Sequence, residues 1–119
     1  MNTVIIDTNI LVYAFEYNID LEEALKEALD TSFEIAIIAM TKKELTGKKN
    51  ANGIEAWLEK KRVKLINPPE GCINVDQAIL AVVDKETYVV TQDKRLKEKL
   101  KKRYIPVLSI RQKKYLMIG

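Results

Sequence analysis

The stretch V-V-T-Q-D-K-R-L-K-E-K-L-K-K-R-Y, residues 89–104, joins an apolar, β-prone segment to a helix-like segment through an acid. The β-branched run stops at Thr91, and Asp93 follows two residues later, just ahead of a series of lysines. Leu96 and Leu100 have the i, i+4 spacing of a helix face that packs on a core. The stretch therefore predicts a strand over residues 88–91, a turn that carries a carboxylate, and an amphipathic helix.

The alternation of strand and helix patterns continues on both sides of this stretch. Short apolar runs predict further strands over residues 4–6, 34–39, 63–66 and 106–110. Helix-like spacing predicts further helices over residues 8–17, 21–29, 41–47, 54–61 and 75–83. This order predicts an α/β domain, a three-layer α/β/α sandwich around a central, mainly parallel sheet. No repeat or linker interrupts the pattern, so we expect a single domain over residues 1–119.

The composition excludes several classes of protein and site. The 119 residues include no histidine and one cysteine, Cys72. Serine–histidine–aspartate triads and histidine-ligated zinc are therefore excluded, and so is an internal disulfide. No apolar run approaches the roughly 20 residues of a membrane-spanning helix, and Asp7 interrupts the first apolar stretch, so no signal peptide is indicated. We expect a cytoplasmic protein with no membrane association.

The positive charge is concentrated near the carboxyl end of the chain. The net charge is only +3, but residues 94–103 combine seven lysines and arginines with one acid, Glu98. A solvated helix face explains such a run as well as a surface that binds a polyanion. On the second interpretation, the residues expected to contact nucleic-acid phosphates are Lys94, Arg95, Lys97 and Lys101. Tyr88, Tyr104 and Tyr115 could stack on bases, although a place in the core or at its rim explains them more simply.

Four acids are expected at one edge of the predicted sheet, where the carboxyl ends of parallel strands form binding sites. They are Asp7, Glu44, Asp76 and Asp93, each of which follows a predicted strand or opens the next helix. Each also has a structural explanation. Asp7 and Asp93 could be N-caps, Glu44 could complete a capping box with Thr41, and Asp76 suits the positive end of a helix.

The convergence of the four acids favours a metal site over capping alone. Capping does not require acids to approach one another, whereas clustered carboxylates repel unless a cation neutralises them. Oxygen ligands without histidine or cysteine favour Mg²⁺ or Mn²⁺ over zinc. With the basic helix beside the site, nucleic acid is the expected polyanionic substrate.

The motifs together resemble the PIN-domain family. They are V-I-I-D-T-N-I-L-V-Y at residues 4–13, T-K-K-E-L at 41–45, N-V-D-Q-A-I-L at 74–80 and V-V-T-Q-D-K-R-L-K at 89–97. The ending Y-I-P-V-L-S-I-R-Q-K-K, residues 104–114, is similar to the branch near the ribosomal-RNA processing nucleases and the archaeal VapC-type toxin ribonucleases. The resemblance implies a five-stranded parallel sheet and an endoribonuclease dependent on Mg²⁺ or Mn²⁺.

The resemblance also implies roles for particular residues and partners. Asp7, Glu44, Asp76 and Asp93 would form the catalytic metal site, supported by the polar side chains of Asn9 and Thr91. The implied partners are RNA, an antitoxin protein or a ribosome-assembly protein, and a second copy in a homodimer. Two departures stand out: Arg95 occupies a position that is acidic in many relatives, and the chain is short between Asp7 and the second strand.

The sequence pattern has two other functional interpretations. A phosphoacceptor receiver domain needs an aspartate at the end of a middle strand, and no aspartate occurs between Thr31 and Val75. The stronger alternative is a PIN-fold module that binds RNA or a ribosome-assembly partner and cuts weakly or not at all, which the positive charge of Arg95 favours.

Overall fold

The sheet that the sequence predicts is present. The computed structural model describes residues 1–119, and its strands form one sheet in the order β3-β2-β1-β4-β5-β6. The strands are β1 (Asn2–Ile6), β2 (Phe33–Ile38), β3 (Lys64–Ile66), β4 (Thr87–Val90), β5 (Val107–Arg111) and β6 (Tyr115–Ile118). Strands β1 to β5 pair in parallel, and only β6 is antiparallel to its neighbour. The mainly parallel sheet is therefore confirmed.

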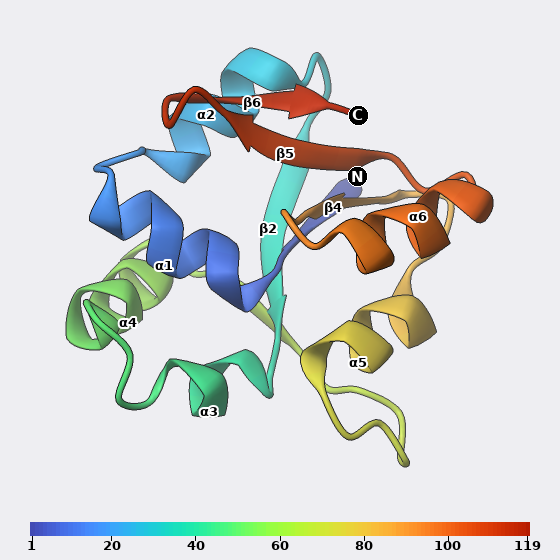
Figure 1. Cartoon of the computed structure of the whole chain (residues 1–119), viewed down its shortest axis with the longest axis horizontal. Coiled ribbons are helices and arrows are strands. Elements are labelled where there is room, and N and C mark those ends of the chain that lie inside the picture. Colours follow the sequence, from blue (N-terminus) through green and yellow to red (C-terminus); the bar gives the residue numbers. More distant parts are fainter.

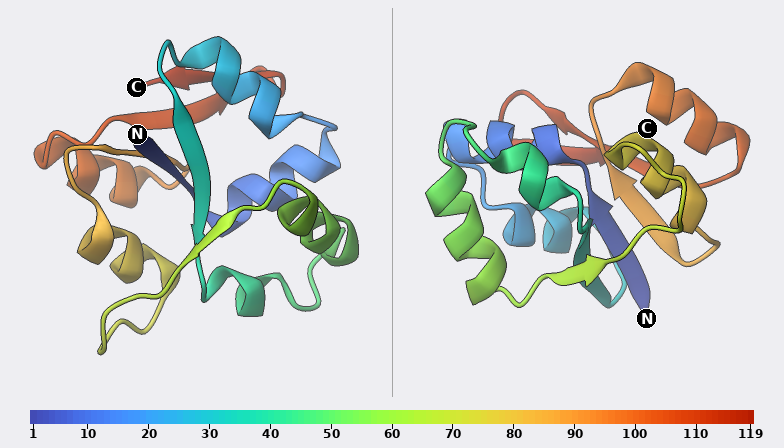
Figure 2. Two further views of the ribbon diagram at one scale, coloured as in Figure 1. Left: turned by 180° about the vertical axis from the view of Figure 1, so that it is seen from behind. Right: turned by 90° about the horizontal axis from the view of Figure 1, so that it is seen from below.

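Helices cover both faces of this sheet, as the views in Figures 1 and 2 show. They are α1 (Thr8–Glu16), α2 (Leu21–Ala28), α3 (Thr41–Leu45), α4 (Ala51–Lys60), α5 (Val75–Val82) and α6 (Lys94–Lys102). Helices α1, α2 and α4 share one apolar cluster, and α5 and α6 share another. The three-layer sandwich is confirmed. None of the helices combines the length and the apolar character needed to cross a membrane.

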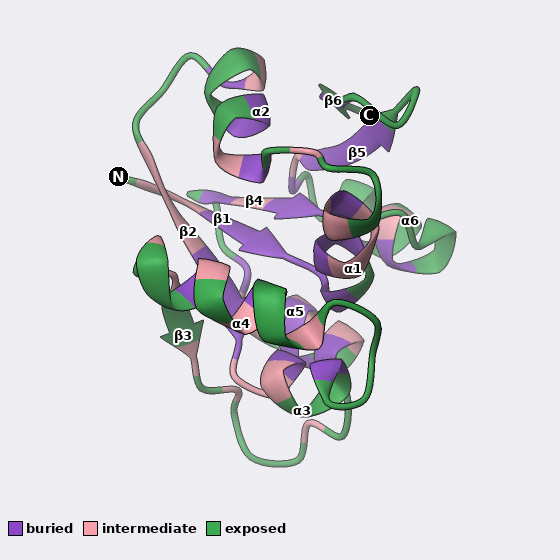
Figure 3. Cartoon of the chain, turned by 90° about the vertical axis from the view of Figure 1, so that its left-hand side faces the viewer, coloured by how far each residue is buried: buried purple, intermediate pink, exposed green.

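Successive residues of the apolar strands alternate between the two apolar clusters. Val4 and Ile6 of β1 belong to the α1 side, whereas Ile5 between them belongs to the α5–α6 side. Val90 and Val89 of β4 divide in the same way. Successive side chains of a strand point to opposite faces, so a strand covered on both faces must be apolar throughout. Figure 3 shows the buried strands enclosed by helices whose outer faces are exposed.

The sheet has a sixth strand, β6, that no pattern in the sequence predicts. A tight turn joins it to β5, in which the Lys114 N–H donates to the Arg111 carbonyl at 3.1 Å. Gln112 and Lys113, the two central residues, both have φ = 55°. A hairpin turn with positive φ at both centres normally carries Asn-Gly or Asp-Gly. The Gln-Lys pair gives no such signal, so the sequence does not predict the hairpin.

One predicted cap is present and another is wrong. The Asp20 carboxylate accepts from the Glu23 N–H at 3.1 Å and caps α2, as expected. The capping box between Thr41 and Glu44 does not form, because Thr41 already lies inside α3 and the helix has no side-chain cap. The Thr41 hydroxyl is instead buried and accepts a hydrogen bond from the Thr8 hydroxyl at 3.3 Å. Glu44 is thus not required for capping.

The packing of α6 gives a direct test of this fold. Leu96 and Leu100 are buried in the α5–α6 cluster, while Lys102 is exposed. We expect Leu100→Ala to lower the free energy of unfolding by about 2–5 kcal/mol, because it leaves a cavity in the core. Lys102→Ala is the matched control and should change it by less than about 0.5 kcal/mol. Urea unfolding measures both, and equal losses would contradict the orientation of α6.

Candidate active site

The Asp7 carboxylate is buried at the junction of β1 and α1, with a relative exposure of only 6%. One of its oxygens accepts from the Thr8 N–H at 2.8 Å and caps α1. The other accepts from the Thr91 hydroxyl at 2.7 Å. A buried carboxylate is tolerated when hydrogen bonds replace its lost hydration, and these two bonds fix both oxygens in place.

Thr91 joins two of the four acids. Its hydroxyl donates to Asp7 and also accepts from the Asp93 N–H at 3.1 Å. The Asp93 carboxylate then accepts from the Leu96 N–H at 3.0 Å and caps α6. Thr91 itself is held by the Ser109 hydroxyl, which donates to its carbonyl at 3.1 Å. The supporting position expected for Thr91 thus corresponds to a hydrogen-bonded link between β1, β4 and β5.

Glu44 and Asp76 come to the same edge of the sheet from α3 and α5. Figure 1 shows the starts of α1, α5 and α6 directed toward one central region, with α3 beside it. Asp93 and Glu44 are both exposed, and Asp76 is partly buried. All four acids lie close enough to affect the protonation of a neighbour, as the shifts of Asp7 and Asp76 show.

Burial and mutual repulsion raise the pKa of two of these carboxyl groups. The pKa of Asp7 is raised first by burial and then by the charges of Asp76 and Glu44, against the lowering effect of the Thr91 and Thr8 hydrogen bonds. The pKa of Asp76 is raised by burial and by the charges of Asp93 and Glu44, and Lys99 opposes this shift. The four acids therefore form one electrostatically coupled group.

The carboxylate oxygens of the four acids are ligands of the kind that a hard divalent cation prefers. The three salt bridges of the structure involve Glu22, Glu34 and Glu55, and none of the four acids has a cationic partner within 4.0 Å. No three acidic side chains are placed to hold one ion as they stand. A cation would therefore need a change of rotamer or bridging waters, and the exposed side chains of Glu44 and Asp93 leave room for both.

The other residues singled out in the sequence lie around this group. Asn9 is exposed on α1, two residues after Asp7, and its side chain has no hydrogen bond within the protein. Lys94, Arg95 and Lys101 are exposed on α6. Lys97 is partly buried, and its pKa is lowered by that burial and by the nearby charges of Arg111, Lys101 and Lys94.

Two contributions were missed in the sequence. The Gln92 side chain pairs with β5 as a strand residue would: its amide oxygen accepts from the Ile110 N–H at 2.8 Å, and its amide nitrogen donates to the Ile110 carbonyl at 3.4 Å. Arg111, at the end of β5, joins the cations around Lys97. A lone glutamine after a strand carries no signal for such pairing. The basic R-Q-K-K ending is evident in the sequence, but nothing in the sequence predicts that Arg111 lies near Lys97.

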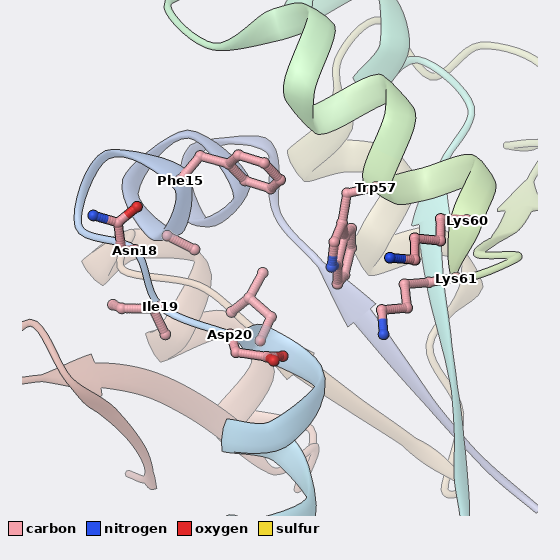
Figure 4. A pocket seen from close by; sticks show the side chains of 9 residues that line it. Phe15, Asn18, Ile19, Asp20, Trp57, Lys60 and Lys61 are labelled. Carbon is pink, nitrogen blue, oxygen red and sulfur yellow. The ribbon is translucent and has the colours of Figure 1, made fainter.

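A separate hollow lies between α1, the start of α2 and α4, with a volume of about 360 Å³. Phe15 and Trp57 meet edge to face in its wall, with ring centroids 6.4 Å apart, and Lys60 and Lys61 lie beside them (Figure 4). None of the four acids lines it. The candidate site is therefore the open acidic edge of the sheet and not this hollow.

Comparisons with known proteins agree with the geometry. A family model described as a PIN-like domain matches residues 4–113. The chain is 36% identical over 129 residues to ribonuclease VapC4 of Methanocaldococcus jannaschii, across 99% of this chain and 97% of that protein. Its fold is similar to the solved structure of the PIN domain endonuclease Utp24, with a TM-score of 0.85 and 26% identity over 98% of this chain and 90% of that one. The range matched by the family model includes the positions of all four acids.

The raised pKa of Asp7 predicts a specific dependence of stability on pH. The folded chain retains the Asp7 proton to higher pH than the unfolded chain, so the contribution of Asp7 to stability falls as the pH rises from about 3.9 through the folded pKa. Asp7→Asn cannot ionise and keeps an oxygen for the cap. Without metal, the free energy of unfolding of Asp7→Asn should therefore increase relative to that of the wild type as the pH rises from about 3.9 through the folded pKa of Asp7.

Urea unfolding in buffer with a chelator, repeated over a series of pH values, measures this gain. Asp30→Asn, at an exposed position before β2, is the matched control and should follow the wild type. A difference between Asp7→Asn and the wild type that stays constant with pH would contradict the raised pKa.

Proposed function

Because the chain belongs to the family of PIN-like domains, we propose that it is a metal-dependent endoribonuclease that hydrolyses RNA phosphodiester bonds. The observation that carries the proposal is the group of four coupled acids without cationic partners at the carboxyl edge of the sheet. The two similar proteins, a ribonuclease and an endonuclease, support it. The proposed role is that of a toxin-type ribonuclease or of an RNA-processing enzyme.

In this proposal Asp7, Asp76 and Asp93 hold one or two Mg²⁺ or Mn²⁺ ions, and Glu44 binds directly or through water. A bound ion would make water a stronger nucleophile near neutral pH and stabilise the charge that develops on the phosphate. Asp7 supplies the fixed point, because Thr8 and Thr91 hold its two oxygens. Asp93 keeps one oxygen on the α6 cap and has the other free of hydrogen bonds within the protein.

The fold itself favours an anion at this edge. Helices α1, α5 and α6 all begin there, and the N-terminus of a helix carries a partial positive charge. These helix ends partly offset the repulsion among the acids. They also attract the phosphate of a substrate.

The cations of α6 are proposed to hold the RNA backbone next to the acids. Lys94, Lys97 and Lys101 lie at i, i+3 and i+7, on one side of the helix. Contacts of this kind go to phosphates and carry no base specificity. Asn9 would add a neutral polar contact near the scissile phosphate, and Arg95 a further positive charge.

A second candidate function is an RNA-binding module that cuts weakly or not at all. Two observations favour it: Arg95 is exposed in the first turn of α6, near Asp93, and no three acids are placed to hold an ion as they stand. Both functions predict RNA binding. Manganese binding together with cleavage distinguishes the enzyme from the module.

Neutral replacement of two acids tests the metal site. In Asp7→Asn/Asp93→Asn, both caps keep an acceptor oxygen, so the fold should survive. We expect Mn²⁺ binding to be lost and cleavage to fall by more than about 100-fold, since even residues that merely orient metal ligands cost about 10–100-fold. Calorimetry and a cleavage assay measure these effects, with Asp30→Asn as the control. Unchanged Mn²⁺ affinity in the folded double variant would place the site elsewhere.

The basic helix is tested separately by the salt dependence of RNA binding. Lys94→Ala/Lys97→Ala/Lys101→Ala should weaken binding to all sequences and reduce the slope against log salt by about 0.7–0.9 for each lost phosphate contact. Asp93→Asn should leave that slope nearly unchanged. Filter binding over a salt titration gives the slopes, and Lys85→Ala, at the opposite edge of the sheet, is the control. If the triple variant keeps the wild-type slope, the lysines are a solvated surface only.

A further inference from the structure

A pair of buried hydroxyl groups joins α1 to α3. Thr8 is the first residue of α1 and Thr41 is the first residue of α3, and their relative exposures are 3% and 0%. The Thr8 hydroxyl donates to the Thr41 hydroxyl at 3.3 Å, across 33 positions of the sequence. A hydrogen bond requires a particular distance and direction, whereas apolar contact is not directional. The pair therefore restricts how α3 lies against α1 more narrowly than two valines of the same shape would.

Helix α3 has few other contacts that could fix its position. It has five residues, and it begins after Met40 without a side-chain cap. Thr41 and Leu45 are its buried residues, and their i, i+4 spacing places them on one face. Leu45 packs in the apolar cluster that α1 and α4 share. Because so short a helix is not stable alone, α3 depends on these two side chains, and of the two only Thr41 makes a directional contact.

Glu44 is the acid that α3 brings to the candidate site. Its side chain is exposed and takes part in none of the three salt bridges. Its charge raises the pKa of both Asp7 and Asp76, so the Glu44 carboxylate lies near both of these acids. Because Glu44 follows Thr41 by three residues on the same short helix, a shift of α3 changes the distance between Glu44 and Asp7.

Thr8 contacts Asp7 as well as α3. Its N–H donates to the Asp7 carboxylate at 2.8 Å, while its hydroxyl binds Thr41. Thr91 has the corresponding place on the other side of Asp7, because its hydroxyl donates to Asp7 and accepts from the Asp93 N–H. The buried aspartate therefore lies between two threonines, and each of them leads to an element that carries another acid.

We propose that the Thr8–Thr41 hydroxyl pair positions Glu44 opposite Asp7 and so sets the separation of two carboxylates of the acidic site. The inference rests on the proposed function, because this separation matters where the two carboxylates act on one divalent cation. A ligand binds more tightly to groups that are already in place, since less conformational freedom is lost on binding. Both hydroxyls are buried, so Thr8 and Thr41 are positioning residues and not ligands.

Two double variants separate the effect of the hydroxyls from that of packing. Thr8→Val/Thr41→Val removes both hydroxyls and keeps the shape, and replacing both partners of a hydrogen bond in this way changes stability little. Thr8→Ser/Thr41→Ser keeps both hydroxyls but removes two buried methyl groups, which lowers stability. The valine variant should therefore be stable with α3 loosened, and the serine variant should be less stable with α3 in place.

Hydrogen exchange followed by NMR in metal-free buffer measures how firmly α3 is held. The Glu44 N–H donates to the Met40 carbonyl at 3.2 Å. In the valine variant we expect this amide to exchange about 2- to 10-fold faster, the effect of losing one net hydrogen bond. The amides of α5 and α6 should keep their wild-type rates, because the pair does not hold those helices.

Calorimetry with Mn²⁺ alone, without RNA, measures the consequence for the site. The valine variant should bind Mn²⁺ about 10- to 100-fold more weakly, as is usual when a residue that orients a metal ligand is lost. The serine variant should keep the wild-type affinity despite its lower stability. Thr87→Val is the matched control, because this buried threonine donates to Asp84 at 3.0 Å from the start of β4, at the opposite edge of the sheet.

A double-mutant cycle identifies the acid through which the pair acts. Glu44→Gln removes the charge of the acid that the pair is proposed to position. In that background Thr8→Val/Thr41→Val should weaken Mn²⁺ binding no further, since both changes remove the same contribution. A loss that persists in full in the Glu44→Gln background would show that the threonines act through Asp7 or through the fold, and would overturn the inference.

The remaining outcomes separate this inference from the proposed function. Wild-type Mn²⁺ affinity in the valine variant, or equal losses in the valine and serine variants, would overturn the positioning of Glu44 and leave the enzyme. An unchanged exchange rate of the Glu44 amide in the valine variant would overturn it as well. A wild type that binds no Mn²⁺ removes the proposed enzyme, and the exchange rates alone then decide whether the pair holds α3.

Discussion

The hydrogen bond from the Thr91 hydroxyl to the buried Asp7 carboxylate is the interaction on which the arrangement of the site depends. It spans 84 positions of the sequence and ties the end of β1 to the end of β4 at 2.7 Å. An ionised carboxylate inside an apolar sheet costs several kcal/mol unless such bonds replace its water. Because Thr91 also accepts from the Asp93 N–H, the same hydroxyl sets where α6 begins.

The four acids are costly to the fold. Burial raises the pKa of Asp7 and Asp76, and the acids repel one another across the edge of the sheet. The helix N-termini at this edge offset part of that repulsion, but no lysine or arginine forms an ion pair with any of the four acids. Functional sites are often less stable than the same positions would be with neutral residues. A group that served only to cap helices would not need four charges.

The sequence predicted the parts of the structure that follow from local pattern. Apolar strands alternating with amphipathic helices specified the parallel sheet, and the position of each acid after a strand specified the edge at which it lies. Strand β6 was missed because Gln112 and Lys113 are not residues that favour its turn. The predicted capping box is absent because Thr41 lies inside α3, where its hydroxyl bonds to Thr8, a partner 33 residues away. Pairings between distant polar side chains have no period, so a single sequence does not reveal them.

For Asp7 and Asp93, capping a helix does not exclude binding a metal ion. Each carboxylate has two oxygens with two lone pairs apiece, and a cap uses one of these positions. The Asp93 oxygen that accepts from Leu96 leaves the other oxygen without a partner in the protein. Both of the Asp7 oxygens accept one hydrogen bond, and each retains a further lone pair. The cap also holds the carboxylate at the positive end of a helix, where a phosphate is attracted as well. The local rule that explains why an acid precedes α1 and α6 is therefore the same rule that brings these two acids together.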